Sequence, residues 1–358
     1  MSTKEEKINN FDPSQPGSSE ASIYGLPFTA EESEIIIIPV PWEVTVSYGA
    51  GASLGPEAIL EASYQVDLLH EEFPELWKLG IYMDKIPKDW KLESDRLKIL
   101  AQPIIEALEN GDDIKTFPIL QENLITINNA CQSLNVALEE RIQHWMAQDK
   151  KIILLGGDHS TPLGYYNALA TKYANFGILH FDAHMDLREA YEGFTYSHAS
   201  IMFNAITIPQ VSKLVQVGIR DFCEQEVALA IESEKIHVFT DKQLKAKQFE
   251  GVSWESQVES IIELLPENVA ISFDIDALYQ WYCPNTGTPV PGGLSYEQAI
   301  YMLSKLASSD KKIIGIDLVE VAPGQDQWDG NVGARLLFHL CGVIAKNNGL
   351  NTGSEIQF

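Results

Sequence analysis

Short apolar runs without polar alternation recur along the chain, and each one ends in polar residues. They cover Glu34–Val40, Lys151–Leu155, Phe176–Phe181, Lys213–Ile219, Asn268–Phe273 and Lys312–Val319. Runs of this kind are typical of strands buried on both faces, as in a parallel sheet. Helical patterns lie between them, at Gly55–Ser63, Leu134–Gln148, Glu224–Glu232 and Tyr296–Ser308. The alternation predicts a doubly wound α/β sheet with helices on both faces.

Two segments fall outside this strand–helix pattern. Residues 1–22 are rich in Ser, Pro, Asn and charged side chains, so we predict a flexible N-terminal extension there. Residues 84–130 show the weakest patterning, and we predict that they form a helical insertion packed on the main domain. That main domain is predicted to span residues 23–358.

The charge balance restricts the kinds of partner. Acidic residues outnumber basic ones by 51 to 25, which gives a formal net charge of −26. Such a surface repels phosphate backbones and anionic lipid, so neither nucleic acid nor membrane is expected as a partner. The four cysteines are far apart and show no zinc-binding spacing. The first residues lack the apolar core of a signal peptide, and no run of about 18 apolar residues occurs. We therefore expect a cytoplasmic protein.

Unusual polar residues follow three of the predicted strands. His159 follows the strand at Lys151–Leu155, and Asp274 and Asp276 follow the strand at Asn268–Phe273. Carboxyl ends of parallel strands meet at one edge of a sheet, and residues two apart in an extended exit point the same way. The remaining members of this set follow Phe181 and are Asp182, His184 and Asp186. Six side chains with ligand atoms are therefore expected to converge.

Four clustered carboxylates repel one another and raise one another's pKa values unless cations neutralise them. Two divalent ions would do so, and carboxylates with a minority of imidazoles favour Mn²⁺, with Ni²⁺, Co²⁺ or Zn²⁺ as alternatives. Two ions that share a water also lower its pKa and supply a hydroxide that can attack a guanidinium. Each motif alone has a plainer interpretation. The turn after Gly157, for example, could simply cap a helix through Asp158 or Ser160. All three motifs at successive strand ends favour the metal site.

The motifs as a set resemble the ureohydrolase family, which includes arginases, agmatinases, guanidinobutyrases, formiminoglutamases and guanidine hydrolases. The resemblance covers about residues 34–345. The segments that carry it are GGDHS at 156–160, FDAHMD at 181–186, SFDID at 272–276, TGTPVPGG at 286–293, GIDLVEVAP at 315–323 and PWEVTVSYGAGASLGPEAILEAS at 41–63. The resemblance implies a three-layer α/β/α fold of the arginase type, and a homo-oligomer, either trimer or hexamer. It also implies that the six converging side chains are metal ligands.

The resemblance also assigns roles beside the metals. His198 matches the family histidine that transfers a proton to the leaving amine, although it could instead cap the following helix. Glu320 matches the acidic residue that pairs with the guanidinium. Asp276 is expected to assist departure of the amine. Asp158 is expected to support the ligands rather than to bind metal.

Two departures from the family pattern concern the substrate. The loop after Asp276 is bulkier and more aromatic through Tyr279–Cys283, so it either narrows the pocket or forms a subunit contact. Arginases carry an amide-bearing residue where this chain has Arg188. An arginine there disfavours the amine tail of agmatine and tolerates a carboxylate tail. Alternatively it pairs with Glu189 or Glu192, either as a surface salt bridge or in a way that leaves a pocket suited to guanidine.

The sequence therefore predicts a binuclear metal-dependent hydrolase that cuts a guanidino or amidino C–N bond and releases urea. An agmatinase-type enzyme acting on a small guanidino compound leads by overall likeness. The alternatives are a guanidine hydrolase, a formiminoglutamase or guanidino-acid hydrolase, and a deacetylase-like hydrolase with a single zinc ion. A catalytically silent regulatory subunit is an alternative from another class. The presence of both His159 and Asp276 favours two metal ions over one.

Overall fold

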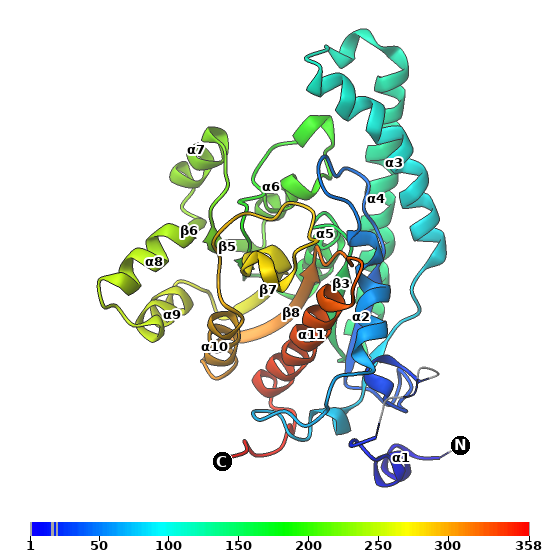
Figure 1. Cartoon of the computed structure of the whole chain (residues 1–358), viewed down its shortest axis with the longest axis vertical. Coiled ribbons are helices and arrows are strands. Elements are labelled where there is room, and N and C mark those ends of the chain that lie inside the picture. The colour runs from blue at the N-terminus through cyan, green and yellow to red at the C-terminus, as the bar shows by residue number, and fades with distance from the viewer. Residues whose placement is uncertain (1, 16–17, 19–20, 358) are drawn as a thin grey trace.

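A parallel sheet forms the centre of the molecule. The computed structural model describes residues 2–15, 18 and 21–357, and these residues contain eight strands in one sheet (Figure 1). The strand order is β2-β1-β3-β8-β7-β4-β5-β6, and every neighbouring pair is parallel. The strands are β1 (Ile35–Val40), β2 (Ile81–Met83), β3 (Lys151–Gly156), β4 (Phe176–Phe181), β5 (Val211–Ile219), β6 (Ile236–Thr240), β7 (Asn268–Asp274) and β8 (Lys312–Val319).

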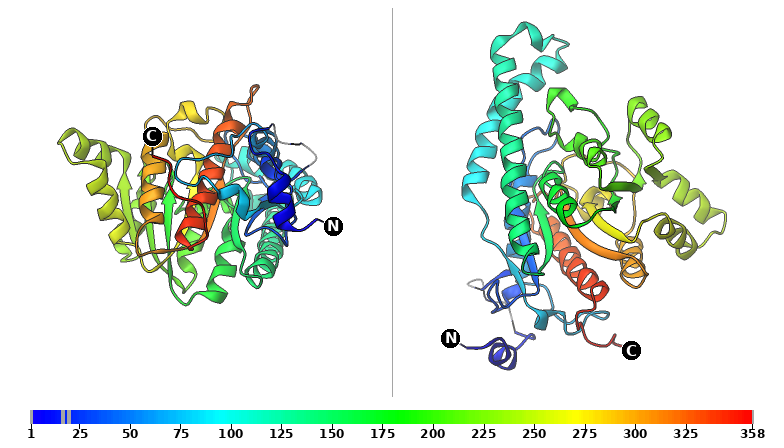
Figure 2. Two further views of the ribbon diagram at one scale, coloured as in Figure 1. Left: turned by 90° about the horizontal axis from the view of Figure 1, so that it is seen from below. Right: turned by 180° about the vertical axis from the view of Figure 1, so that it is seen from behind.

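Helices cover both faces of the sheet. The helices of the described residues are α1 (Lys4–Asn10), α2 (Gly55–Ser63), α3 (Lys88–Glu109), α4 (Pro118–Met146), α5 (Leu163–Lys172), α6 (Ile201–Thr207), α7 (Glu224–Glu232), α8 (Asp241–Phe249), α9 (Trp254–Glu263), α10 (Tyr296–Ala307) and α11 (Trp328–Asn347). The layers are visible in the two views of Figure 2.

The four consecutive isoleucines of β1 explain why two separate cores form. Ile35 and Ile37 point to one face and pack in a cluster with residues of α2, α9, α10 and α11. Ile36 and Ile38 point to the other face and pack with residues of α3, α4, α5 and α6. Side chains alternate between the faces of a strand, so a continuous apolar run feeds both cores. The three-layer α/β/α architecture predicted from the sequence is confirmed.

The segment at 84–130 contains α3 and the first part of α4. The two helices pack against each other and extend beyond the rest of the chain at the top of Figure 1. Within residues 1–22, α1 contacts the main body through an ion pair of 2.6 Å between Lys7 and Glu32, and Phe11, which follows α1, makes a ring contact with Trp77. The flexibility predicted for residues 1–22 remains a prediction, and residues 1, 16, 17, 19 and 20 of that segment lie outside the described residues.

None of the helices in the described ranges is both long enough and apolar enough to cross a membrane.

Candidate metal centre and substrate cavity

The four central strands bring the predicted ligands together. β3, β8, β7 and β4 are neighbours in the sheet, and all end at the same edge. His159 follows β3, Glu320 follows β8, Asp274 ends β7, and Asp182 follows β4. Residues from distant parts of the sequence therefore meet because the strands that precede them are hydrogen-bonded neighbours.

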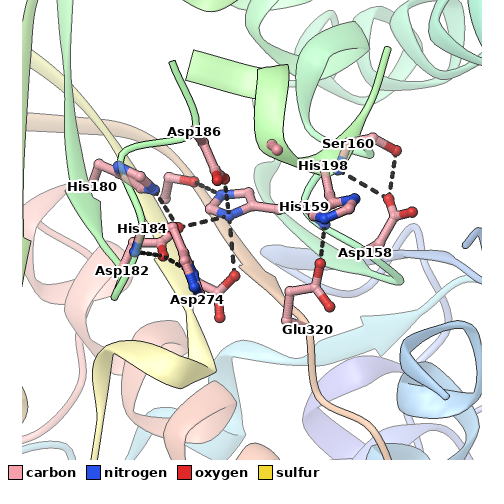
Figure 3. Close-up of polar contacts among 12 residues, drawn as sticks. Asp158, His159, Ser160, His180, Asp182, His184, Asp186, His198, Asp274 and Glu320 are labelled. Atoms are coloured by element: carbon pink, nitrogen blue, oxygen red, sulfur yellow. Dashed lines mark hydrogen bonds and ion pairs between the residues drawn. The ribbon is translucent and has the colours of Figure 1, made fainter. Parts of the chain in front are cut away.

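A first group of side chains surrounds the His159 ring (Figure 3). Its Nδ1 lies 3.0 Å from Asp182 Oδ2, 3.2 Å from Asp186 Oδ2 and 3.1 Å from Asp274 Oδ2. All four residues are buried. Despite these short distances, Nδ1 makes no hydrogen bond of acceptable geometry with any described residue. A buried ring nitrogen is thus directed at a point that three carboxylates also approach.

A second group shares Asp182 with the first. The Nδ1 atom of His184 lies 3.3 Å from Asp182 Oδ1 and 3.1 Å from Asp276 Oδ2. Backbone N–H groups hold the carboxylates in place: Ala183 donates to Asp276 Oδ1 at 2.9 Å, and Asp276 donates to Asp274 Oδ1 at 2.8 Å. The structure therefore brings all six predicted ligands into two overlapping groups.

Hydrogen bonds assign the tautomer of His159. Its Nε2 lies 2.9 Å from Ser272 Oγ, and the Ser272 hydroxyl donates to Asp317 Oδ1 at 2.8 Å. Because Ser272 gives its proton to Asp317, its oxygen accepts from His159 Nε2–H. The neutral ring then carries a lone pair on Nδ1, the atom that faces the carboxylates. Metal-binding histidines are oriented by this kind of partner.

His180 supports Asp182 in a similar way. The side-chain amide of Gln216 donates to His180 Nδ1 at 2.9 Å, so the proton of the neutral His180 ring is on Nε2. Nε2 lies 2.8 Å from Asp182 Oδ2 and donates to it. These supporting residues, and also Ser272 and Asp317, were not predicted from the sequence. Polar residues inside otherwise apolar strands were the available signal.

The electrostatics of the groups favour a bound cation. Burial, followed by the charges of Asp276 and Asp182, raises the pKa of Asp274 well above its ordinary value. Burial and the charge of Asp182 likewise raise the pKa of Asp186. Buried carboxylates at these distances are stable as anions only beside positive charge. The mixture of carboxylate oxygens and imidazole nitrogens, with Asp182 common to both groups, fits a pair of divalent ions.

Two non-glycine residues of the site have left-handed backbone conformations. Asp186 has a φ of 53° and Glu320 a φ of 63°. Such conformations cost about 1–2 kcal/mol for residues with a Cβ, so surrounding contacts must hold them. Glu320 is held by its backbone N–H, which donates to Gly157 O at 2.9 Å, and by Thr286, whose hydroxyl donates to Glu320 O at 2.9 Å.

Glu320 is a buried carboxylate beside the first group. Its Oε1 accepts a hydrogen bond of 2.8 Å from the backbone N–H of His159. Burial, with the nearby charges of Asp274 and Asp158, raises the pKa of Glu320 well above its ordinary value. A cation that entered the cavity would stabilise the ionised form of Glu320.

The glycine pair before Asp158 allows the β3 exit to approach a neighbouring loop. A Cβ on Gly157 would lie 1.9 Å from the backbone oxygen of Trp42.

Asp158 Oδ1 accepts hydrogen bonds from the backbone N–H of Ser160 at 3.0 Å and from the Ser160 hydroxyl at 2.5 Å. Burial raises the pKa of Asp158 to about 6. Asp158 stabilises the turn that carries His159, and it belongs to neither ligand group.

A cavity of about 350 Å³ opens onto the ligand groups and is lined by His159, His184, Asp186, Asp274 and Glu320 at one end. His198 also lines it, at the start of the 3₁₀ turn His198–Ser200. Burial is the largest cause that lowers the pKa of His198 to about 4, so its imidazole is neutral near pH 7. The capping interaction at this turn comes from Ser197, which accepts from Ala199 N–H.

Arg188 lines the same cavity and lies close to Glu226, with 3.8 Å between Arg188 Nε and Glu226 Oε2. It forms no ion pair within 4.0 Å with Glu189 or Glu192, the partners that the sequence suggested; both of these residues lie in the described range.

The residues 279–283, three of which are aromatic, are not among the residues that line this cavity. Their predicted role as a pocket wall is therefore not realised, and a subunit contact remains a prediction.

An all-parallel α/β sheet with two overlapping His/Asp groups at its carboxyl edge defines a class of metal-binding α/β hydrolase. Comparison with known proteins makes the class specific. The family model described as Arginase family matches residues 33–342. The chain belongs to the arginase family.

Individual relatives agree with this assignment. The chain is 30% identical over 313 residues to an N(1)-aminopropylagmatine ureohydrolase of Thermus thermophilus, covering 87% of this chain and 91% of that protein. It is 29% identical to an agmatinase of Bacillus cereus, with 84% and 87% covered. Among solved structures, agmatine ureohydrolase of Thermoplasma volcanium superimposes with a TM-score of 0.68 at 20% identity, covering 91% of this chain and 94% of that one. The last comparison supports the fold.

Proposed function

We propose that this protein hydrolyses a guanidino or amidino C–N bond of a small substrate, and that guanidino substrates yield urea. The observation that carries the proposal is the convergence of six ligand side chains from three strand ends into two groups that share Asp182. The arginase-family membership and the relatives named for agmatine and aminopropylagmatine support the reaction class.

The proposed ligands of two divalent ions are His159, Asp182, His184, Asp186, Asp274 and Asp276. Mn²⁺ is the first choice and Ni²⁺ the second for this donor set. Bound ions supply Lewis acidity and lower the pKa of water, which provides a nucleophile near neutral pH. A single-zinc deacetylase-like hydrolase would leave the second group, with His184 and Asp276, unexplained.

Glu320 is the proposed partner of the substrate's positive charge. It lines the cavity, lies beside the ligand groups, and has a carboxylate that burial makes costly to ionise alone. A guanidinium offers parallel N–H donors to a carboxylate, and such charge-assisted pairs are the strong ones. Glu320 would thereby orient the central carbon of the substrate toward the ligand groups.

Asp276 and His198 are the proposed carriers of the proton. Addition of water to the central carbon releases a proton, and cleavage of the C–N bond requires one at the leaving nitrogen. The carboxylate of Asp276 is suited to accept the first proton. The neutral imidazole of His198 can take up a proton at one ring nitrogen and give one up from the other nitrogen to the leaving group. His198 lines the cavity and is largely uncharged at neutral pH.

The substrate is proposed to be a guanidino compound of about the length of agmatine, because the cavity has room for a short tail. Guanidine, formiminoglutamate and guanidino acids are the alternatives. We also propose a cytoplasmic location and a homo-oligomer, trimer or hexamer, as the family resemblance implies.

The test is the release of urea by purified protein loaded separately with Mn²⁺ or Ni²⁺. The substrates are agmatine, guanidine, arginine, 4-guanidinobutanoate and formiminoglutamate, with formamide followed for the last. Product from any of them supports the reaction class. A protein that binds neither metal and releases no product is instead a silent member of the family, and the proposal fails.

A further inference from the structure

The substrate cavity has a buried end and an exposed end. Glu320 and Asp274 are buried and supply negative charge beside the ligand groups, whereas Arg188, whose side chain is 39% exposed, and the half-buried Tyr191 line the outer part. Its volume of about 350 Å³ corresponds to about twelve water-sized groups at about 30 Å³ each. One guanidinium takes up well under half of that space. The remainder accommodates a tail, and the charge near Arg188 must decide which tail is accepted.

Neighbouring side chains hold Arg188 in place without accepting hydrogen bonds from its guanidinium. Its Nε lies 3.8 Å from Glu226 Oε2, which is beyond hydrogen-bonding distance, and its guanidinium carbon lies 4.7 Å from the centre of the Tyr191 ring. Its backbone N–H donates to Ala199 O at 3.1 Å. Among the described residues, no acceptor takes a hydrogen bond from its guanidinium, whose side chain is 39% exposed. Glu226 thus orients one edge of the Arg188 guanidinium and Tyr191 orients one face. The outer N–H donors of the guanidinium remain available to a ligand.

Glu226 is already engaged with other donors. Its Oε1 accepts from the backbone N–H of Leu187 at 3.0 Å, and its Oε2 accepts from the backbone N–H of Cys223 at 2.9 Å. Glu226 lies in the first turn of α7, where backbone N–H groups and the helix dipole stabilise a carboxylate. Its negative charge is therefore largely compensated by these two N–H donors and by the start of α7, and Arg188 keeps the capacity to bind an anion.

We propose that Arg188 binds the carboxylate of the substrate tail, so that the substrate is a short guanidino or amidino acid rather than an amine. This inference rests on the function proposed above. A planar guanidinium with free outer donors matches a carboxylate in a bidentate pair. An amine tail would instead meet like charge at this end. Asp221 also lines the cavity, but its exposed carboxylate is screened by water and attracts an amine only weakly.

The test compares three substrates of equal chain length that differ in the end group: 4-guanidinobutanoate, agmatine and butylguanidine. Urea release gives kcat/KM for the wild type and for Arg188→Met, Arg188→Lys and Arg96→Met. Arg96 is a matched control, since it lies on α3 and pairs with Glu93 away from the cavity. The wild type should prefer the acid to both other compounds.

In Arg188→Met, the ratio of kcat/KM for 4-guanidinobutanoate to kcat/KM for butylguanidine should fall by about 10- to 100-fold, as expected for loss of hydrogen bonds to a charged group. The agmatine-to-butylguanidine ratio should rise. Arg188→Lys keeps the charge without the planar fork and should give an intermediate ratio. Arg96→Met should match the wild type in both ratios.

A wild-type preference for agmatine, or an acid ratio that Arg188→Met leaves unchanged, overturns the inference while the reaction class stands. Cleavage of guanidine but of none of the three tailed compounds likewise overturns the inference about Arg188 and leaves the reaction class standing. Metal-loaded protein that releases no urea from these compounds or from arginine, and no formamide from formiminoglutamate, contradicts the proposed function itself.

Discussion

Ser272 offers a sharp test of how the metal site is built. It lies in β7, two residues before Asp274, and is fully buried. Its hydroxyl oxygen faces His159 Nε2 at 2.9 Å, and its proton goes to Asp317 at 2.8 Å. Tyr166 donates to the other oxygen of Asp317 at 2.9 Å. In the neutral ring this relay places the proton on Nε2, so Nδ1 carries the lone pair that a metal ligand requires.

Ser272→Ala removes one atom and breaks both hydrogen bonds. Two buried groups, His159 Nε2–H and Asp317 Oδ1, lose a partner, and each such loss costs about 1–3 kcal/mol. We expect the free energy of unfolding of the metal-free protein to fall by about 2–4 kcal/mol, allowing for relaxation around the smaller side chain. Loss of the group that orients a histidine ligand should weaken metal binding by about 10- to 100-fold.

The assay is competition of the protein with a chelator for Mn²⁺ or Ni²⁺, with occupancy measured by elemental analysis. Urea-induced unfolding of the metal-free protein measures stability separately. Ser260→Ala is the matched control, because Ser260 bonds to the Ser256 carbonyl within α9. A folded Ser272→Ala protein with wild-type metal affinity would refute the assignment of the relay, even if its stability were reduced.

Three further outcomes are expected. Asp276→Ala should lose metal and turnover together, as elemental analysis and urea release would reveal; two bound ions with full activity would contradict its assignment. His198→Ala should keep the metals while turnover falls by about 10²- to 10⁴-fold, and unchanged kinetics would remove its proton-transfer role. Burial, with the charges of His70 and Lys346, lowers the pKa of His339 to about 3. Only the unfolded chain therefore gains this proton as the pH falls below about 6.5, and stability drops by about 1.4 kcal/mol per pH unit. His339→Leu should flatten that slope in urea-unfolding experiments at pH 5–7, and a slope equal to that of a His144→Leu control would contradict the assignment.

The sequence predicted the strands that are buried on both faces. The apolar runs Phe176–Phe181 and Lys312–Val319 coincide with β4 and β8, because central strands need apolar residues on both sides. The two edge strands were missed. β2 has three residues, and β6 is partly exposed along most of its length, so neither carries a continuous apolar run. Edge positions relax the pattern on which the prediction depends.

The site residues that directly follow strands were predictable from the sequence. The contacts that depend on which strands and helices lie side by side were not. Polar residues after apolar runs identified the side chains that converge, beginning with His159 and Asp182. The contact of Ser272 with His159 depends on the order β3-β8-β7 in the sheet, which a single sequence does not contain. The pairing of Arg188 with Glu226 likewise requires α7 to lie beside the exit of β4.

The two ends of the cavity come from different parts of the fold. The ligand groups and Glu320 lie directly after the four central strands, whereas Arg188 and Tyr191 lie farther along the connection after β4, and Glu226 lies at the start of α7. Substitutions in these peripheral segments leave the central strand ends intact. A lineage of such enzymes can therefore acquire a new substrate tail through a few changes near the surface, while the reactive chemistry is inherited unchanged.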